Sequence, residues 1–387
     1  MPRAEAIERR VRQRLAELEA AGLRRRLRPP AGIDLSSNDY LCLANHPLLK
    51  ARMVAAVERE GCGATASRLL RGEREAFAGV ERRFATFKRT ESALFFGSGY
   101  AANIAALTTF LEEGDVVFSD ELNHASLIDG LRLARARRVI FPHCDIQALS
   151  RLLVAERGPG EKFLVTESLF SMDGDAAPLR DYASLCRETH TALIVDEAHA
   201  IGVYGVRGSG LIEESGIDEE VFLSINTAGK ALGVGGAFVA GPAWAIDYLV
   251  QRARPLIFST APPPAMAAAL DAALEVIVNE PERRAQVLKR AGLLRDLLTE
   301  GGAPMLSGGS QIIPVMIGDN RRATAVAAAL HEAGFDVRAV RPPTVPPGTA
   351  RLRISVNVDL DETTLRRFAA ALFSTLAEIK ACSTESS

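Results

Sequence analysis

Seven short apolar runs recur between residues 93 and 240 of the chain. They are ALFF, VVFS, RVIF, FLVT, ALIV, FLSI and AFVA, at residues 93–96, 116–119, 138–141, 163–166, 192–195, 222–225 and 237–240. Most are near-continuous rather than alternating, as expected for strands that are covered on both faces. Helical segments separate most of the runs, which favours parallel connections. The pattern therefore predicts a large α/β domain with a mainly parallel sheet.

The hydrophobic pattern changes on either side of this domain. Near the N-terminus, apolar residues at helical spacing predict an amphipathic helix, and they are Ile7, Val11, Leu15 and Leu18. After a helical stretch at 262–279, the pattern indicates a smaller α+β unit. Its predicted helices are 281–299, 321–333 and 361–378, and its predicted strands are 312–318, 336–340 and 351–355. We therefore predict a helical segment at 1–43, a large domain at 44–277 and a small domain at 278–387.

The composition excludes several classes of function. The chain has 46 basic and 48 acidic residues, so it lacks the basic excess that is typical of nucleic-acid binders. Five dispersed cysteines without a CxxC pair indicate reduced thiols and no metal cluster. No apolar run is long enough to cross a membrane, and the Arg-rich N-terminus lacks the apolar core of a signal peptide. We expect a cytoplasmic protein with neither a nucleic-acid nor a membrane partner.

Candidate chemistry gathers where predicted strands end, which is where open α/β sheets bind ligands. The first cluster is GSGYAAN, residues 97–103, between a predicted strand and a predicted helix. Free backbone N–H groups and the helix terminus could bind a phosphate there. The same letters also fit a loose GxGxxA dinucleotide motif or a plain tight turn, and the motif alone does not decide among the three.

The stretch LIVDEAHAIG, residues 193–202, places Asp196 at the end of a buried strand and His199 three residues later. DEAH is also the acidic box of helicases, which need an upstream phosphate loop GxxxxGK[ST]. The chain has no such loop, because its one Gly-Lys, at 229–230, lies downstream and is followed by Ala. The helicase interpretation therefore lacks a nucleotide site, and an assay of ATP hydrolysis would test it.

Two further residues are ambiguous when each is taken alone. His124, in SDELNHASL (119–127), stands at a strand-to-helix turn, where a capping histidine is common. Lys230, in NTAGKALGVGGAF (226–238), could belong to a glycine-rich surface turn. The small residues around Lys230 also leave room for a large, flat group beside its amine.

Together, the clusters match the chemical needs of pyridoxal phosphate. The cofactor's aldehyde can bond to the amine of Lys230, and Asp196 can keep the ring nitrogen protonated. The turn at 97–100, with the Thr227 hydroxyl, can hold the phosphate. A dinucleotide dehydrogenase would leave Lys230, Asp196 and His199 without a role. We therefore predict pyridoxal phosphate as the cofactor and no metal.

The motifs, in this order, resemble those of the α-oxoamine synthases, a family of fold-type I pyridoxal-phosphate enzymes. The resemblance covers nearly the whole chain and rests on SSNDYLCL (36–43), GATASRLLRGE (63–73), GSGYAAN, NHASLIDG (123–130), TESLFSMDGDAAPL (166–179), DEAHAIGVYG (196–205), TAGKALG (227–233), FSTAPPP (258–264) and RPPTVPPGTARLRIS (341–355). It implies an α/β fold with a large cofactor domain, a small C-terminal domain and an active site shared between two subunits of a homodimer.

The resemblance also implies roles for single residues. Lys230 would hold the cofactor and transfer the proton, Asp196 would pair with the ring nitrogen, and His124 would stack on the ring. The implied cofactor-binding residues are Gly99, Tyr100, His124, Ser171, Asp196, His199, Thr227, Lys230 and Thr260, the last reaching the phosphate of the neighbouring subunit. The implied catalytic residues are Lys230, His124, Asp196 and His199. The implied substrate-binding residues are Arg24, Asn38, His124, Thr344 and Arg353.

Within the family, SMDGDAAPL (171–179) and PPTVPPGTARLR (342–353) resemble the branch that serves biotin synthesis. This implies L-alanine and a pimeloyl thioester, on coenzyme A or on acyl carrier protein, as substrates, with loss of CO2 and the free thiol. The alternatives are relatives that use glycine with acetyl-CoA or succinyl-CoA, or serine with a long-chain acyl-CoA. A non-catalytic cofactor-binding protein is a further alternative, and turnover would exclude it.

Overall fold

The structure, a computed structural model, describes residues 2–384 and the side chains of residues 4–379. The chain divides into two compact units. We call residues 38–171 and 175–288 the large unit, and residues 1–37, 172–174 and 289–387 the small unit. The N-terminal segment therefore shares a compact unit with the C-terminal part of the chain.

All seven apolar runs form strands of one sheet in the large unit. The strands are β2 (Ser92–Phe96), β3 (Val116–Asp120), β4 (Arg137–Phe141), β5 (Lys162–Glu167), β6 (Thr191–Asp196), β7 (Val221–Thr227) and β8 (Ala237–Gly241). Their order is β2-β8-β7-β6-β5-β3-β4, and β8 alone runs antiparallel to its neighbours. The prediction of an α/β fold with a mainly parallel sheet is confirmed.

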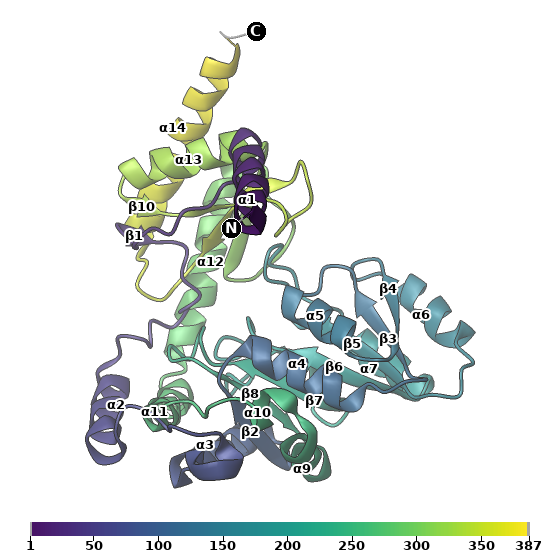
Figure 1. The fold of residues 1–387 in the computed structure, drawn as a ribbon. Helices are drawn as coiled ribbons and strands as arrows, with labels where there is room; N and C mark the ends of the chain where they lie inside the picture. The colour runs from purple at the N-terminus through teal and green to yellow at the C-terminus, as the bar shows by residue number, and fades with distance from the viewer. Residues whose placement is uncertain (1, 385–387) are drawn as a thin grey trace. The chain divides into compact units, whose positions relative to one another are not determined.

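Helices of the large unit pack on the sheet and on one another, and both sides of the central strands are buried. The helices are α2 (Pro47–Glu60), the π-helix η1 (Arg68–Gly72), α3 (Glu75–Lys88), α4 (Gly99–Phe110), α5 (Ala125–Leu133), α6 (Ile146–Ala155), α7 (Leu179–Glu188), α8 (Leu211–Ser215), α9 (Ala243–Arg252), α10 (Arg254–Ile257) and α11 (Pro264–Asn279). Figure 1 shows α4 and α5 side by side along the sheet. α12 (Glu282–Glu300) begins in the large unit and ends in the small unit.

The continuous apolar runs follow from this double covering. In β2, Leu94 and Phe96 pack in the cluster that includes Leu107 of α4. Phe95 points to the other face, where its ring centroid lies 6.0 Å from that of Phe77 of α3. Successive residues of a strand point to opposite faces, so each must be apolar when both faces are covered.

The small unit is built on two short sheets. In one, β11 (Arg338–Val340), β12 (Ala350–Ser355) and β9 (Ile312–Gly318) pair antiparallel in that order. In the other, β1 (Ile33–Asp34) pairs parallel with β10 (Phe335–Asp336). α1 (Pro2–Ala20), α13 (Asn320–Glu332) and α14 (Glu362–Thr384) are its further helices. The strand predicted at 336–340 is thus divided between two sheets, with Val337 between them.

The predicted amphipathic helix forms as α1, but its apolar stripe is largely exposed. Ile7, Val11, Leu15 and Leu18 are 52, 45, 38 and 40% exposed. The helical spacing of these apolar residues predicted the helix, but it did not show whether their side chains would be buried. Among the described residues, no helix combines the length and the apolar character that a membrane crossing requires.

Candidate active site

The residues with candidate chemistry lie at one edge of the large unit's sheet. β3, β5, β6 and β7 are parallel neighbours, so their carboxyl ends share that edge. β2 runs in the same direction, because it and β7 are both antiparallel to β8. The segments beginning at Gly97, Glu121, Ser168, Glu197 and Ala228 therefore all follow strands at this edge.

Lys230 belongs to a chain of polar contacts after β7. Its Nζ lies 2.7 Å from Nε2 of His199, whose Nδ1 lies 2.7 Å from the hydroxyl of Tyr40. Tyr40 donates its hydroxyl proton to Oδ1 of Asn38 at 3.1 Å. In the tautomer that carries its proton on Nδ1, His199 donates to the tyrosine oxygen. Nε2 of the neutral ring is then an acceptor for the lysine amine.

Asp196 ends β6 and is buried, with 4% of its surface exposed. It accepts the backbone N–H of Ala198 at 2.9 Å and the side-chain amide of Asn103 at 2.7 Å. The same amide contacts the Ser126 hydroxyl at 2.8 Å, and this hydroxyl lies 2.7 Å from Nδ1 of His124. These contacts orient a buried carboxylate that can still accept from a cationic ring N–H.

His124 caps helix α5 and also belongs to this network. Its Nδ1 accepts the backbone N–H of Ser126 at 3.2 Å. Burial lowers the pKa of His124, the nearby Asp196 raises it, and the positive charge of Lys230 lowers it. The ring is therefore neutral near pH 7. His124 therefore does cap the helix, which was one of the two roles expected for it, and only its Nδ1 atom takes part in the cap.

Glu167 stands directly beside Asp196, as its register partner between β5 and β6. Burial raises the pKa of Glu167 to about 8, and the negative charge of Asp196 acts in the same direction. The positive charge of Lys230 opposes both effects. Glu167 is therefore mostly protonated at pH 7, which avoids two adjacent buried carboxylates.

The GSGYAAN turn forms the beginning of helix α4. Ser98 caps the helix by accepting the backbone N–H of Ala101 at 3.1 Å. A Cβ placed on Gly99 would lie 2.3 Å from Oγ1 of Thr227, so only glycine fits there. The beginning of the helix and the Thr227 side chain are thus in close contact, so the Thr227 hydroxyl lies beside the N-terminus of α4. Such a terminus is a ready site for a phosphate.

Three other predicted cofactor residues lie around this edge or near it in the chain. Tyr100 is 45% exposed, and its hydroxyl donates to Asp129 of α5. Ser171 is buried and lies four residues after the end of β5. Thr260 is exposed in the segment between α10 and α11. Their predicted roles stay predictions.

The remaining predicted substrate residues belong to the small unit. Arg353 on β12 is buried, and its guanidinium donates to the Ser355 hydroxyl at 2.8 Å. Arg24 is 45% exposed at its side chain and lies 3.5 Å from the carboxylate of Glu19. Thr344 follows the β11 strand in a turn closed on the Arg341 carbonyl. Their contact with substrate also stays a prediction.

Sequence patterns did not identify Tyr40 or Asn103 as site residues. Tyr40 lies inside SSNDYLCL, where Asn38 alone was singled out, and its contact joins it to a histidine 159 positions away. Asn103 lies four residues after Gly99, one helical turn into α4, so its side chain lies on the same side of the helix. That spacing could have indicated Asn103 as a partner for the buried acid.

A second titratable cluster lies at the same edge and has a structural role. His143 lies 2.9 Å from Asp120 and 2.7 Å from Asp175. Burial lowers the pKa of His143, but the hydrogen bonds to both carboxylates outweigh it and raise the pKa to about 12. Asp120, His143 and Cys144 lie close enough to bind a metal ion. Both ring nitrogens of His143 already contact carboxylates, so we interpret the cluster as an ion-pair network.

The groups at this edge fit pyridoxal phosphate. A lysine amine, a buried carboxylate and a helix N-terminus with a facing hydroxyl match its aldehyde, its ring nitrogen and its phosphate. At Gly99, the lack of a Cβ lets the N-terminus of α4 approach the Thr227 hydroxyl, so backbone N–H groups and a hydroxyl lie side by side. The buried Asp196 provides the second match, since a buried carboxylate needs a cationic or hydrogen-bonding partner.

Comparisons with known proteins agree with this geometry. The family profile described as "Aminotransferase class I and II" matches residues 30–372. The 8-amino-7-oxononanoate synthase of Geobacter sulfurreducens is 46% identical over 374 residues, which cover 92% of this chain and 95% of that protein. The structure of 8-amino-7-oxononanoate synthase from Francisella tularensis has a TM-score of 0.78 at 28% identity, covering 90% of this chain and 98% of that one. Serine palmitoyltransferase from S. paucimobilis with bound PLP has a TM-score of 0.90 at 26% identity, covering 96% and 98%.

Proposed function

The chain belongs to the class I and II aminotransferase family and, within it, to the 8-amino-7-oxononanoate synthases, and from this premise we propose its reaction. It joins L-alanine to a pimeloyl thioester and releases CO2 and the free thiol. The product is 8-amino-7-oxononanoate, a precursor in biotin synthesis. The observation that carries this proposal is the Lys230–His199–Tyr40–Asn38 chain of contacts beside the buried Asp196.

Pyridoxal phosphate is the cofactor, and when bound it supplies an aldehyde for the amine and a ring that withdraws electrons from the amino acid's α-carbon. Asp196 keeps the ring nitrogen protonated, and Asn103 holds this carboxylate in place at 2.7 Å. The N-terminus of α4 and the Thr227 hydroxyl hold the phosphate. Thr260 reaches the same phosphate in the neighbouring subunit of a homodimer.

Lys230 performs the proton transfer from the α-carbon of alanine. A lysine must be neutral to accept a proton, and the Nε2 acceptor of His199, 2.7 Å away, can take a hydrogen bond from the neutral amine. Tyr40 fixes the His199 tautomer that makes Nε2 the acceptor. His124, whose ring is neutral, would stack on the ring of the bound cofactor and help to place the thioester. Ser171 lines the phenolic side with His199.

Polar and charged side chains recognise the substrates. Asn38 and Arg353 bind the carboxylate of alanine, and a buried arginine offers the planar fork that suits a carboxylate. Thr344 and Arg24 contact the substrate, with Arg24 nearer the acyl chain.

A product assay tests this proposal. The cofactor-loaded protein is given L-alanine, glycine or L-serine with pimeloyl-, acetyl-, succinyl- or palmitoyl-CoA, and products are identified by mass spectrometry. We expect the alanine and pimeloyl pair to give the largest kcat/KM and a product with the mass of 8-amino-7-oxononanoate. A serine and palmitoyl preference would instead support the second candidate, which the similarity to serine palmitoyltransferases favours.

A further inference from the structure

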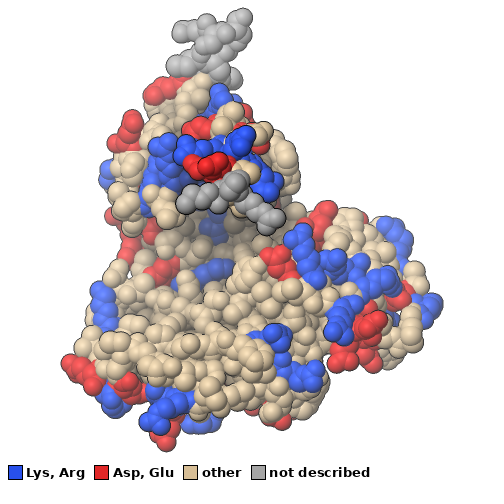
Figure 2. All heavy atoms as spheres, viewed as in Figure 1, with Lys and Arg blue, Asp and Glu red and all other residues tan. Residues whose placement is uncertain are grey.

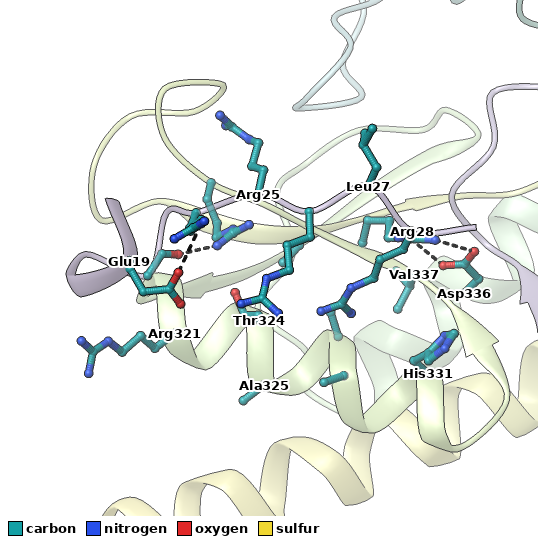
Figure 3. A pocket seen from close by; sticks show the side chains of 18 of the residues that line it. Glu19, Arg25, Leu27, Arg28, Arg321, Thr324, Ala325, His331, Asp336 and Val337 are labelled. Atoms are coloured by element: carbon teal, nitrogen blue, oxygen red, sulfur yellow. Dashed lines mark hydrogen bonds and ion pairs between the residues drawn. The ribbon is translucent and has the colours of Figure 1, made fainter. Parts of the chain in front are cut away.

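Most of the charged side chains that the structure describes are exposed or only partly buried, and Figure 2 shows many of them on the surface. Figure 3 shows a hollow of about 890 Å³ in the small unit, where arginines line the wall and Asp336 pairs with Arg338. The Arg338 side chain is 43% exposed, and ion pairs this open to water contribute little. The His143 network in the large unit is different, because its charged groups are largely shielded and hold one loop.

Residues 168–177 form a short hairpin, which we call the β5 hairpin because it directly follows strand β5. Two main-chain hydrogen bonds join its arms. The Phe170 N–H donates to the Asp175 carbonyl at 2.9 Å, and the Ala177 N–H donates to the Ser168 carbonyl at 3.0 Å. A two-stranded ladder this short is not stable in water without further contacts, so side chains must hold the hairpin in place.

The β5 hairpin carries Ser171, one of the predicted cofactor residues. Ser171 is 9% exposed and belongs to the large unit, whereas the tip of the hairpin, residues 172–174, is part of the small unit. At the base of the hairpin, the Ser168 N–H donates to the main-chain carbonyl of Asp196 at 2.9 Å. The hairpin therefore begins beside the acid that is proposed to pair with the cofactor ring, and Ser171 follows three residues later.

His143 holds the β5 hairpin from the segment between β4 and α6. Its Nε2 lies 2.7 Å from the carboxylate of Asp175, on the second arm. Its ring meets the ring of Phe170, on the first arm, edge to face, with the centroids 4.4 Å apart. Its Nδ1 lies 2.9 Å from the carboxylate of Asp120, the last residue of β3. One imidazole ring thus joins both arms of the hairpin to the end of a strand.

The β3 end of this connection is firmly fixed. The Asp120 side chain is 0% exposed, and its two oxygens accept the backbone N–H groups of Leu122 and Cys144, each at 2.9 Å. The main chain of His143 is held as well, because its N–H donates to the carboxylate of Glu121 at 3.0 Å. Hydrogen bonds to charged groups are stronger than neutral ones, more so when shielded from water. The position of the imidazole is therefore set by β3 and imposed on the hairpin.

We propose that His143 is a positioning residue, which holds the β5 hairpin so that the Ser171 hydroxyl donates to the phenolic oxygen of bound pyridoxal phosphate. The role of Ser171 in this proposal rests on the proposed function. His143 acts through Phe170 and Asp175 rather than by touching the cofactor. Its loss should loosen the two arms and displace one hydroxyl, while the sheet beneath stays folded.

Hydrogen exchange in the full chain, loaded with its cofactor, tests the hold on the hairpin. In His143→Gln, one terminal amide replaces two opposed ring nitrogens, so it cannot bridge both carboxylates. We expect the amides of the peptide 168–177 to exchange roughly tenfold faster, because a charge-assisted hydrogen bond is lost and the hairpin opens locally. Peptides from β6 should exchange as in the wild type.

Variants of Asp175 keep this test valid if His143→Gln does not fold. Asp175→Ala removes the acceptor and should speed exchange in the hairpin as His143→Gln does. Asp175→Asn keeps an oxygen that can accept from Nε2–H, so it should restore part of the protection. Asp247→Ala is the control, since Asp247 is exposed on α9, and it should match the wild type.

The absorbance of the bound cofactor, measured against pH, tests whether the hold acts on Ser171. Ser171→Ala removes a donor to the charged phenolic oxygen and should raise the pH midpoint by roughly half a unit or more. His143→Gln should raise it as well. The double variant should equal Ser171→Ala alone, because a residue that acts through one hydroxyl has no effect once that hydroxyl is gone. The changes in kcat should be non-additive in the same way.

Four outcomes would overturn the proposal. Unchanged exchange in the hairpin would show that His143 does not hold it. Faster exchange with an unchanged cofactor midpoint would show a role in folding alone. Additive shifts in the double variant would show an effect of the lost charge that bypasses Ser171. A midpoint that Ser171→Ala leaves unchanged would remove the role of Ser171 on which the proposal depends. None of the exchange or absorbance measurements needs a substrate, so a synthase with another amino acid or acyl group would still give the expected results.

Discussion

At the residue scale, the site depends on protonation states that buried neighbours set. Asp196 and Glu167 stand side by side, yet only Asp196 has donors on both of its oxygens, from Ala198 and Asn103. Donors to a carboxylate favour its charged form, whereas burial without them favours the neutral form. The raised pKa of Glu167 keeps that acid mostly neutral at pH 7, and Asp196, which has the donors, is the partner for the cofactor ring.

Replacing Glu167 with Gln tests this division. Since the pKa of Glu167 is raised to about 8, the folded state keeps a proton that the unfolded state releases near its ordinary value of 4.5. Wild-type stability should therefore fall as pH rises from 4.5 to 8 and level off above it. Glu167→Gln should flatten the melting temperature over this range and retain activity near pH 7. Equal pH slopes for both proteins would contradict the raised pKa.

A second change at this scale removes one hydroxyl from the polar chain. Tyr40→Phe leaves Nδ1 of His199 without its acceptor, so the tautomer that serves Lys230 is no longer fixed. We expect kcat to fall about tenfold to a hundredfold, with cofactor affinity unchanged. Tyr182→Phe is the matched control, because Tyr182 is equally buried in the large unit and packs against Phe141. A similar loss of kcat in both variants would show a packing effect instead.

At the element scale, the strands were predictable and their arrangement was not. Every apolar run became a strand because a covered strand needs apolar residues at successive positions. The same pattern says nothing about direction, so the antiparallel β8 could not be distinguished from its neighbours. Motif spacing located Lys230 and Asp196 at strand ends. It could not locate Tyr40, whose contact with His199 depends on how the chain folds back.

The junction of β2 and α4 gives a test at this scale. In Gly99→Ala, the new methyl would lie about where the Thr227 hydroxyl lies, since the two positions are 2.3 Å apart. The turn must shift, and we expect cofactor affinity to fall about tenfold or more, as measured by titration of the cofactor-free protein. Gly79→Ala in α3 meets no atom within 4 Å and is the control. It should keep the affinity and stabilise the helix by up to about 1 kcal/mol.

At the scale of the whole molecule, one buried ion pair joins distant parts of the large unit. Lys88, at the end of α3, contacts the carboxylate of Glu197 and the carbonyl of Ser209. Both charged side chains are almost fully buried, at 2% and 0% exposure. Glu197 directly follows Asp196, so this pair also anchors the segment that presents the catalytic acid.

Loss of this pair should destabilise the fold strongly. Lys88→Met leaves Glu197 buried and unpaired, which typically costs about 3–5 kcal/mol of unfolding free energy. Denaturation in urea measures the change, with Lys50→Met as the control because Lys50 is exposed on α2. The control should differ from the wild type by less than about 0.5 kcal/mol. Equal stability of the two variants would show that the pair does not hold the unit together.

The central claim is that the cofactor's aldehyde bonds to Lys230, and one measurement tests it directly. The cofactor-loaded protein is reduced with borohydride, digested and mapped by mass spectrometry. We expect one reduced pyridoxal-phosphate adduct, on the peptide that carries Lys230, and none on Lys88, the buried lysine paired with Glu197. An adduct on another lysine, or no adduct in a protein saturated with cofactor, would contradict the assignment of the site.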